Sequence, residues 1–309
     1  MAVHSARLEA VIHMQKPNGT APSRPLRGIG LMIAGCAFLT AGDAAMKLVV
    51  ANAPTSQAIF LRSALVLLGL TAIYRRNVFT GIGRGASLRL QLLCAVLWGG
   101  SVACFVTSLS YLPLGVAVTA LYTAPLFVAL MAPRMLQEPF DKTTGAAVIV
   151  GFIGTVLVVR PTDFENSFYI ILPLLGALFA AFRDIALRKL TSHSTTQSIL
   201  VVSQVVLAAF FLIPTALVWQ PLDFQQIAIL FIAALCAAFG VGLTVESFRD
   251  NKASFVVPFK YSGVLWGFLI GMALWGEVPA TPQLIGVVLV ISAGVFLSIQ
   301  SRPSIAPPE

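Results

Sequence analysis

Charged residues are scarce in this chain. Only 10 % of its 309 residues are Asp, Glu, Lys or Arg, whereas 58 % are apolar. A typical soluble protein has about 25 % charged residues. A soluble fold of this composition would have too few polar side chains to cover its core. The composition therefore excludes a soluble enzyme, a disordered chain and a secreted disulfide-linked scaffold, and it indicates a protein whose solvent is lipid.

The groups that catalysis and metal binding need are also rare. The three histidines lie outside the apolar segments, and the four cysteines lie inside them without Cys-x-x-Cys spacing. The sequence has no Gly-x-x-x-x-Gly-Lys-Ser/Thr loop for a nucleotide phosphate, and we find no serine nucleophile with a base. We therefore expect no enzymatic activity, no metal or cofactor and no direct use of ATP.

Long apolar runs fill most of the chain, and each has about the length of a helix that crosses a bilayer. Backbone N–H and C=O groups cannot stay unpaired in hydrocarbon, so continuous apolar runs predict helices rather than barrel strands. Short connections that often carry Pro or Gly separate them. The ten expected spans are 29–50, 57–74, 88–110, 114–136, 143–160, 169–190, 197–219, 226–248, 254–275 and 283–300.

The net charge of +8 comes from basic residues that lie mainly between the spans, as at a cytoplasmic membrane surface rather than a nucleic-acid interface. When both termini are assigned to the basic side, Lys47 and Arg160 are the only Lys or Arg residues outside the span interiors that fall on the other side. We therefore expect a multi-pass protein of the inner (plasma) membrane with polar cytoplasmic tails over 1–27 and 301–309. Its expected partners are the lipid bilayer and a small-molecule substrate, with no nucleic acid.

The two halves of the membrane region repeat each other. Tyr122 and Glu138 in the first half are separated by the same number of residues as Tyr261 and Glu277 in the second half. Five spans per half is an odd number, so the second copy must enter the membrane upside down. Inverted repeats are common in secondary transporters, whose site lies at the repeat interface near the midplane. The expected repeats are 28–160 and 161–300.

Three local patterns accompany the span count and the repeat: Gln57-x-x-Phe60-x-Arg62, Tyr122-x-x-Pro125 and Trp275-Gly276-Glu277-x-Pro279. Together they resemble the drug/metabolite transporter superfamily, EamA branch, over about residues 28–300. Within that branch the chain resembles the exporters of amino acids, aromatic ones included. The resemblance implies an all-α fold of ten transmembrane helices, in two inverted five-helix repeats around a central cavity. The second half has Val264 and Val202 in place of Pro125 and Arg62, which argues against a symmetric role for those two residues.

Four ionisable residues inside the expected spans form two matching pairs. Asp43 and Lys47 lie four residues apart on one helix face, and so do Asp184 and Arg188. A charge at the bilayer centre costs about 2.5–3.5 kcal/mol on insertion scales, so these residues are candidates for function. One hypothesis is a gate whose members exchange partners between the repeats. The other is a permanent pair within each helix that offsets the insertion cost.

Two further cations are candidate ligands for the substrate. Lys260, about two turns into the ninth span, is expected to bind a substrate carboxylate, and Arg183 is a second candidate. The alternatives for Lys260 are a structural pair with Asp184 or Glu246, or an ammonium that reaches the cytoplasmic surface. Arg62, close to the start of the second span, is expected to bond helix ends.

Aromatic side chains provide candidate walls for a cavity, because their flat faces suit apolar or aromatic substrates. Packing at the membrane interface is the alternative for each of them. For Glu277 we expect a cap on the following helix or a peripheral gate. The aromatic candidates are Trp98, Tyr122, Tyr261 and Trp266.

These observations predict a secondary transporter that works by alternating access. The expected cargo is amino acids, including aromatic and apolar ones, moved outward. One alternative is uptake of a nucleoside-like metabolite such as S-adenosylmethionine, because some EamA members that resemble the Asp43-x-x-x-Lys47 pattern do this. A channel-like facilitator and a membrane scaffold that transports nothing are further alternatives.

Overall fold

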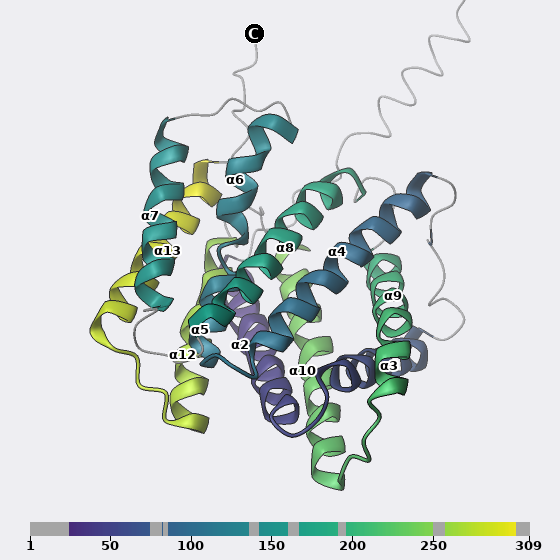
Figure 1. Ribbon diagram of the computed structural model, residues 1–309. Helices are drawn as coiled ribbons and strands as arrows, with labels where there is room; N and C mark the ends of the chain where they lie inside the picture. Colours follow the sequence, from purple (N-terminus) through teal and green to yellow (C-terminus); the bar gives the residue numbers. More distant parts are fainter. Residues whose placement is uncertain are drawn as a thin grey trace, which may run out of the picture.

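The computed structural model describes residues 25–74, 82, 86–135, 142–159, 167–190, 196–249 and 257–300. Every regular element in these residues is helical (Figure 1). Nearly all of the two expected tails lies outside them. The elements are α2 (Pro25–Val50), α3 (Thr55–Tyr74), α4 (Ala86–Ser108), α5 (Leu114–Leu121), α6 (Ala124–Met135), α7 (Lys142–Val159), η2 (Ser167–Ile170), α8 (Ile171–Leu190), α9 (Thr196–Leu217), α10 (Phe224–Arg249), η3 (Val257–Tyr261), α12 (Ser262–Trp275) and α13 (Thr281–Gln300).

Seven helical segments among the described residues are long and apolar enough to cross a membrane, and α5 with α6 counts as one of them. Three shorter apolar helices, Gly145–Val158, Phe259–Trp275 and Thr281–Leu297, fall on the fifth, ninth and tenth expected spans. The all-helical membrane fold is therefore confirmed. Ten full-length spans are not confirmed, because only seven such segments and three shorter helices are found among the described residues.

The fourth expected span is interrupted, which the sequence analysis did not predict. Tyr122 and Thr123 form a turn between α5 and α6. Pro125 has no N–H to donate to the carbonyl of Leu121, four residues earlier, so the helical ladder cannot continue there. The ninth span has a similar irregularity, since the 3-10 turn η3 precedes α12.

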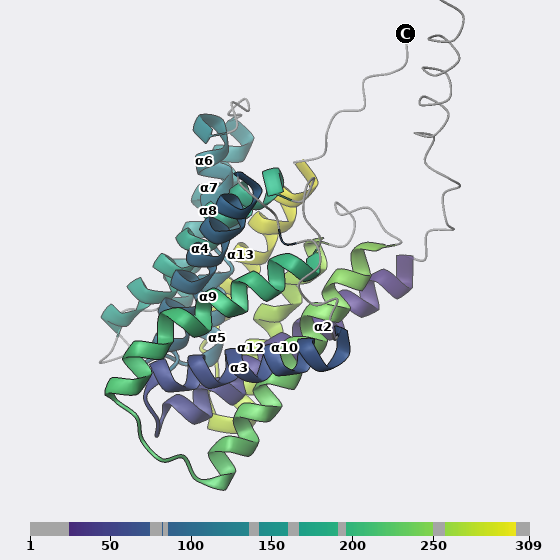
Figure 2. The ribbon, with the colours of Figure 1, turned by 90° about the vertical axis from the view of Figure 1, so that its right-hand side faces the viewer.

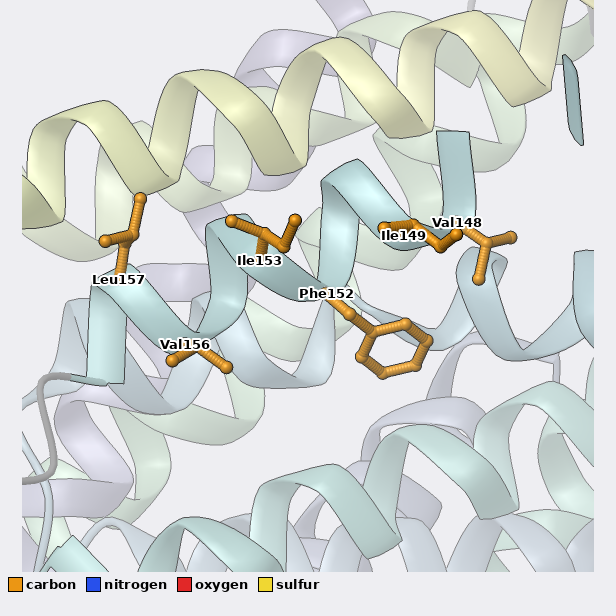
Figure 3. Close-up of a pocket in the computed structure, with 6 residues that line it drawn as sticks. All are labelled: Val148, Ile149, Phe152, Ile153, Val156 and Leu157. Carbon is orange, nitrogen blue, oxygen red and sulfur yellow. The ribbon is translucent and has the colours of Figure 1, made fainter. Parts of the chain in front are cut away.

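Large apolar side chains remain exposed along the outer helices. On α7 the exposed fractions are 61 % for Ile149 and 62 % for Val156, and α9 exposes Phe210 and Ile213 in the same way. A groove of about 380 Å³ on α7 is lined only by apolar side chains, which Figure 3 shows. Hydrocarbon chains of a bilayer match such a surface, and no charged candidate lines the groove.

The helices pack mainly between the two halves of the chain. In Figure 1 α7 lies beside α13 and α4 beside α8, and Figure 2 shows α2 running along α10. The pairs α3–α9 and α5–α12 also join a helix of the first half to one of the second. The interior is therefore an interface between the halves rather than two separate cores.

Glycines allow the closest of these contacts. A Cβ at Gly35 of α2 would lie 2.7 Å from a methyl carbon of Thr244 in α10, and a Cβ at Gly154 of α7 would lie 2.7 Å from the carbonyl oxygen of Gly286 in α13. Real Cβ atoms essentially never come so close. Small residues at such points let helix backbones approach in lipid, where packing rather than hydrophobicity drives association.

Gln57 ties α3 to the connection between α9 and α10. Its buried side chain donates from Nε2 to the carbonyl of Gln220 at 2.7 Å and accepts from the N–H of Gln220 at 3.1 Å. Replacing Gln57 with Leu keeps the volume but removes both bonds, so we expect a loss of about 1–2 kcal/mol in unfolding free energy. Thermal unfolding in detergent measures this. Gln225→Leu, at an exposed position on α10, is the control and should cause no comparable loss.

Candidate functional site

Trp98, Arg183 and Asp184 meet in the middle of the contact between α4 and α8, and we call these three residues the α4–α8 site. The guanidinium carbon of Arg183 lies 4.6 Å from the centroid of the Trp98 ring. Nη1 of Arg183 lies 3.8 Å from Oδ1 of Asp184. That separation is an ion pair but is too long for a hydrogen bond.

Close approach of α8 to α4 depends on glycines in both helices. A Cβ at Gly176 of α8 would lie 3.1 Å from the carbonyl oxygen of Ser101, and Gly100 of α4 faces the ring of Phe179 in the same way. The two helices therefore run close enough for the side chain of Arg183 to reach over Trp98. The sequence analysis named all three residues of the site but did not group them.

The guanidinium of Arg183 is only partly satisfied. Its Nε is buried and has no hydrogen-bond partner among the described residues. The side chain is 19 % exposed, whereas that of Asp184 is 46 % exposed. A buried donor without an acceptor costs about 1–3 kcal/mol, and more when it is charged. The site therefore has unused capacity for an incoming anion, and the adjacent carboxylate is open to an incoming cation.

A second group of charges lies along α2, where the partners differ from those expected within one helix. Asp43 pairs with Arg62 of α3, with Nη1 and Oδ1 4.0 Å apart. Lys47 pairs with Glu277, which follows α12. The permanent Asp43–Lys47 pair is therefore not the arrangement found, because side chains from α3 and from the second half offer closer partners. The side chain of Arg188 and all of Glu138 lie outside the described residues.

Glu277 caps a different helix from the one expected. Its Oε2 accepts the backbone N–H of Leu114, the first residue of α5, at 2.9 Å. At the start of α13 the N–H of Ala280 is instead bonded to Oε1 of Gln283. Sequence order suggested the next helix, but a chain reversal at Gly276 turns Glu277 back toward α5.

Lys260 lies in η3, before α12 begins, and its side chain is exposed. Its backbone carbonyl accepts a hydrogen bond from Sγ of Cys36 at 3.4 Å. The structure therefore places this ammonium at the end of the ninth apolar segment and not two turns inside it. The described residues give Lys260 no ion pair with Asp184 or Glu246.

The other aromatic candidates pack around α12. The indole N–H of Trp266 donates to the carbonyl of Ile33 in α2 at 3.2 Å. The rings of Tyr122 and Tyr261 are 5.9 Å apart, and a Cβ at Gly263 would collide with the Tyr122 hydroxyl. Tyr261 is buried, and its hydroxyl has no partner among the described residues. These residues join α2, α5 and α12, and they do not contribute to the α4–α8 site.

The sequence analysis did not name Trp275 as a candidate site residue, although it takes part in the group of charges along α2. Trp275 closes α12, and the ammonium of Lys47 lies 4.5 Å from the centroid of its ring. The available signal was its position beside Glu277 in the Trp-Gly-Glu pattern, which brings an aromatic ring and a carboxylate to one helix end.

Comparison with known proteins settles the family. The sequence profile of the EamA-like transporter family matches twice, over residues 26–160 and 167–299. This chain belongs to the EamA-like transporter family. It is therefore a multi-pass membrane transporter of small metabolites rather than an enzyme, and the resemblance found in the sequence is confirmed at this level.

One relative is the pseudopaline exporter of Pseudomonas aeruginosa, to which this chain is 25 % identical over 276 residues. The alignment covers 87 % of this chain and 95 % of the exporter. The riboflavin transporter of Vibrio cholerae is 24 % identical, with 89 % and 93 % covered. The S-adenosylmethionine uptake transporter of Rickettsia bellii is 22 % identical, with 90 % and 96 % covered. One of them is an exporter and another takes up its substrate, so family membership fixes neither cargo nor direction.

The fold is also shared with a solved crystal structure, which aligns with a TM-score of 0.59 and covers 88 % of this chain and 97 % of the other. The two sequences are 14 % identical, so this likeness concerns the fold alone. None of the relatives named above is an aromatic amino-acid exporter. That narrower part of the resemblance stays a prediction.

Proposed function

We propose that this EamA protein is a secondary transporter of the inner membrane for metabolites that carry an α-amino-acid head group, amino acids among them. The observation that carries the proposal is the α4–α8 site. It presents a cation and an anion 3.8 Å apart, beside an aromatic face, in the middle of the contact between the two halves.

The chemistry of an α-amino acid matches these groups. Its carboxylate suits the fork of N–H donors on Arg183, of which Nε has no partner. Its ammonium suits the half-exposed carboxylate of Asp184. The ring of Trp98 offers a flat surface to an apolar or aromatic side chain of the substrate. Each charge of the zwitterion would then be paired away from water, as a site within lipid requires.

We also propose that 28–160 and 161–300 are inverted repeats with both termini in the cytoplasm. The double match of the family profile supports the repeat, and the basic residues between the spans support the cytoplasmic termini. The helix pairs support the repeat as well. By their order in the two halves, α2 corresponds to α8, α3 to α9, α4 to α10 and α7 to α13. Exchanging each helix for its counterpart turns the α2–α10 pair into the α8–α4 pair and leaves the α3–α9 and α7–α13 pairs unchanged. Such an arrangement supplies two related conformations, one open to each side of the membrane.

S-adenosylmethionine is a second candidate cargo, because it carries the same amino-acid head group. The similarity to the Rickettsia uptake transporters favours it. For amino acids we propose outward movement, down the gradient of a cell that holds them at high concentration. A uniporter of this kind needs no coupling ion.

Counterflow in proteoliposomes tests the proposal. Unlabelled phenylalanine, leucine or S-adenosylmethionine inside the vesicles should accelerate the entry of labelled phenylalanine or labelled S-adenosylmethionine. Phenethylamine, which lacks the carboxylate, should not compete, because it leaves Arg183 unpaired.

Liposomes without protein set the background of this assay. Trans-stimulation separates a carrier from a pore or a scaffold, neither of which shows it. If none of the three compounds stimulates exchange, the assignment of an amino-acid head group is wrong.

A further inference from the structure

The carboxylate of Glu277 joins three helices at one end of the bundle. One of its oxygens binds the ammonium of Lys47 in α2, and the other accepts the N–H of Leu114 at the start of α5. Glu277 itself follows the last residues of α12. We call Lys47, Leu114, Trp275 and Glu277 the end cluster. Its helix ends lie in the lower part of Figure 1.

Local backbone geometry explains why Glu277 reaches inward. Gly276 has φ +66°, a left-handed conformation that glycine adopts without steric cost. The N–H of Glu277 bonds the carbonyl of Gly271, and the N–H of Gly276 bonds that of Met272. The bond from Gly276 to Met272, made by a residue in the left-handed conformation, is the αL type of helix end. Gly271 also leaves room for the carboxylate, because a Cβ there would lie 2.5 Å from Oε2 of Glu277.

The interactions of the end cluster reinforce one another. A carboxylate at a helix N-terminus is stabilised by the helix dipole and by the free N–H groups of the first turn. The side chains of Lys47 and Glu277 are only 13 % and 20 % exposed, so water screens their attraction weakly. The face of the Trp275 ring adds a cation–π contact with Lys47. Breaking the cluster at Glu277 therefore removes several linked contacts at once.

The end cluster crosses the boundary between the two halves. Lys47 and Leu114 belong to the first half, whereas Trp275 and Glu277 belong to the second. Directly inside it, α5 and α12 meet where a Cβ at Gly267 would lie 3.2 Å from Cβ of Val118. Val118 is 2 % exposed. The seam between α5 and α12 is therefore tightly closed at Val118.

We propose that Glu277 is a latch that holds this end of the transporter closed, and that its release from Lys47 and from α5 opens the seam between α5 and α12. The inference rests on the alternating-access part of the proposed function but not on its substrate. Gln57 is not part of the latch. Its bonds to Gln220 join α3 to the connection between α9 and α10 and do not cross the seam between α5 and α12.

Thiol labelling of full-length protein in membrane vesicles tests the latch. In a protein with the four native cysteines replaced by alanine, Val118→Cys is the probe for the seam. Asn52→Cys, exposed in the connection after α2, reports reagent access at the same end. A membrane-impermeant maleimide is added to the face away from the termini. We expect slow labelling of the Val118→Cys probe when the latch is intact. In Glu277→Gln and in Lys47→Met we expect labelling about tenfold faster or more, because losing a hydrogen bond to a charged group shifts the opening equilibrium by about that factor.

The double variant Lys47→Met with Glu277→Gln should label no faster than the faster single variant, because one shared interaction is broken once. Gln57→Ala, which removes a contact at the same end of the bundle, should leave the labelling of the seam unchanged. Labelling of the Asn52→Cys probe should be the same in all of these proteins.

Unchanged labelling of the Val118→Cys probe in both single variants would overturn the latch. So would an increase in Gln57→Ala as large as that in Glu277→Gln, since that result indicates general loosening. The assay contains no substrate. A labelling response without counterflow would therefore reject the proposed cargo and leave the latch standing, whereas counterflow without the response would do the reverse.

Discussion

Replacing Arg183 with Gln is expected to lower the kcat/KM for counterflow of α-amino acids about a hundredfold, in line with the cost of removing one partner from a desolvated charge pair. The amide keeps a polar side chain but loses the charge and the stacking of the guanidinium on Trp98. Arg183→Lys keeps the charge without the planar fork and should retain part of the activity. Initial rates over a range of substrate concentrations measure both effects.

Lys260→Ala is the matched comparison, because Lys260 is the cation that the sequence analysis favoured as the carboxylate ligand. Its exposed position in η3 leads us to expect transport close to that of the unmodified protein. If Lys260→Ala loses transport while Arg183→Gln keeps it, the carboxylate binds at Lys260 and the α4–α8 site is not the substrate site. Thermal unfolding of each variant separates a binding defect from a folding defect.

Gly286→Leu is expected to lower the unfolding free energy by about 3 kcal/mol or more, the upper part of the range for overpacking. The nearest atoms to a Cβ at this position are in Gly154 and Val158 of α7, and two of the three are backbone atoms. Backbone atoms cannot rotate aside, so α7 and α13 must move apart. The side chains of Ala293 and Leu297 would also lose their contacts with Leu126 and Val148.

Gly242→Leu is the control for the Gly286→Leu variant. Gly242 lies within α10, is exposed, and a Cβ there would meet nothing within 4 Å. The same added volume should therefore cause no comparable loss at this position. Denaturation midpoints in detergent compare the two variants, and equal losses would show that the α7–α13 contact does not set the effect.

Much of the fold could be predicted because it depends on local composition. The apolar runs located the seven long apolar segments and the three shorter ones among the described residues, and Pro125 accounts for the break between α5 and α6. The ends of helices were predicted less well. Lys260 was assigned to the inside of a helix, although Pro258 in the 3-10 turn η3 is typical of a helix start and not of its interior.

The partners of the charged residues were harder to predict, because they come from helices far apart in sequence. Spacing within α2 suggested Asp43 with Lys47, yet Asp43 faces Arg62 of α3 and Lys47 faces Glu277. A helical spacing says which residues share a face of one helix. It does not say which other helix that face meets.

The sequence by itself determined the solvent, the all-helical class and the family of this protein. These follow from apolar content, run length and motifs, which are properties of the chain read in order. Only the tertiary structure decided that Arg183 lies on Trp98 and that Glu277 reaches the start of α5. In lipid the apolar faces of different helices are nearly equal in hydrophobicity. Which helices become neighbours therefore depends on close backbone packing at glycines. That choice of neighbours sets the partner of each charge.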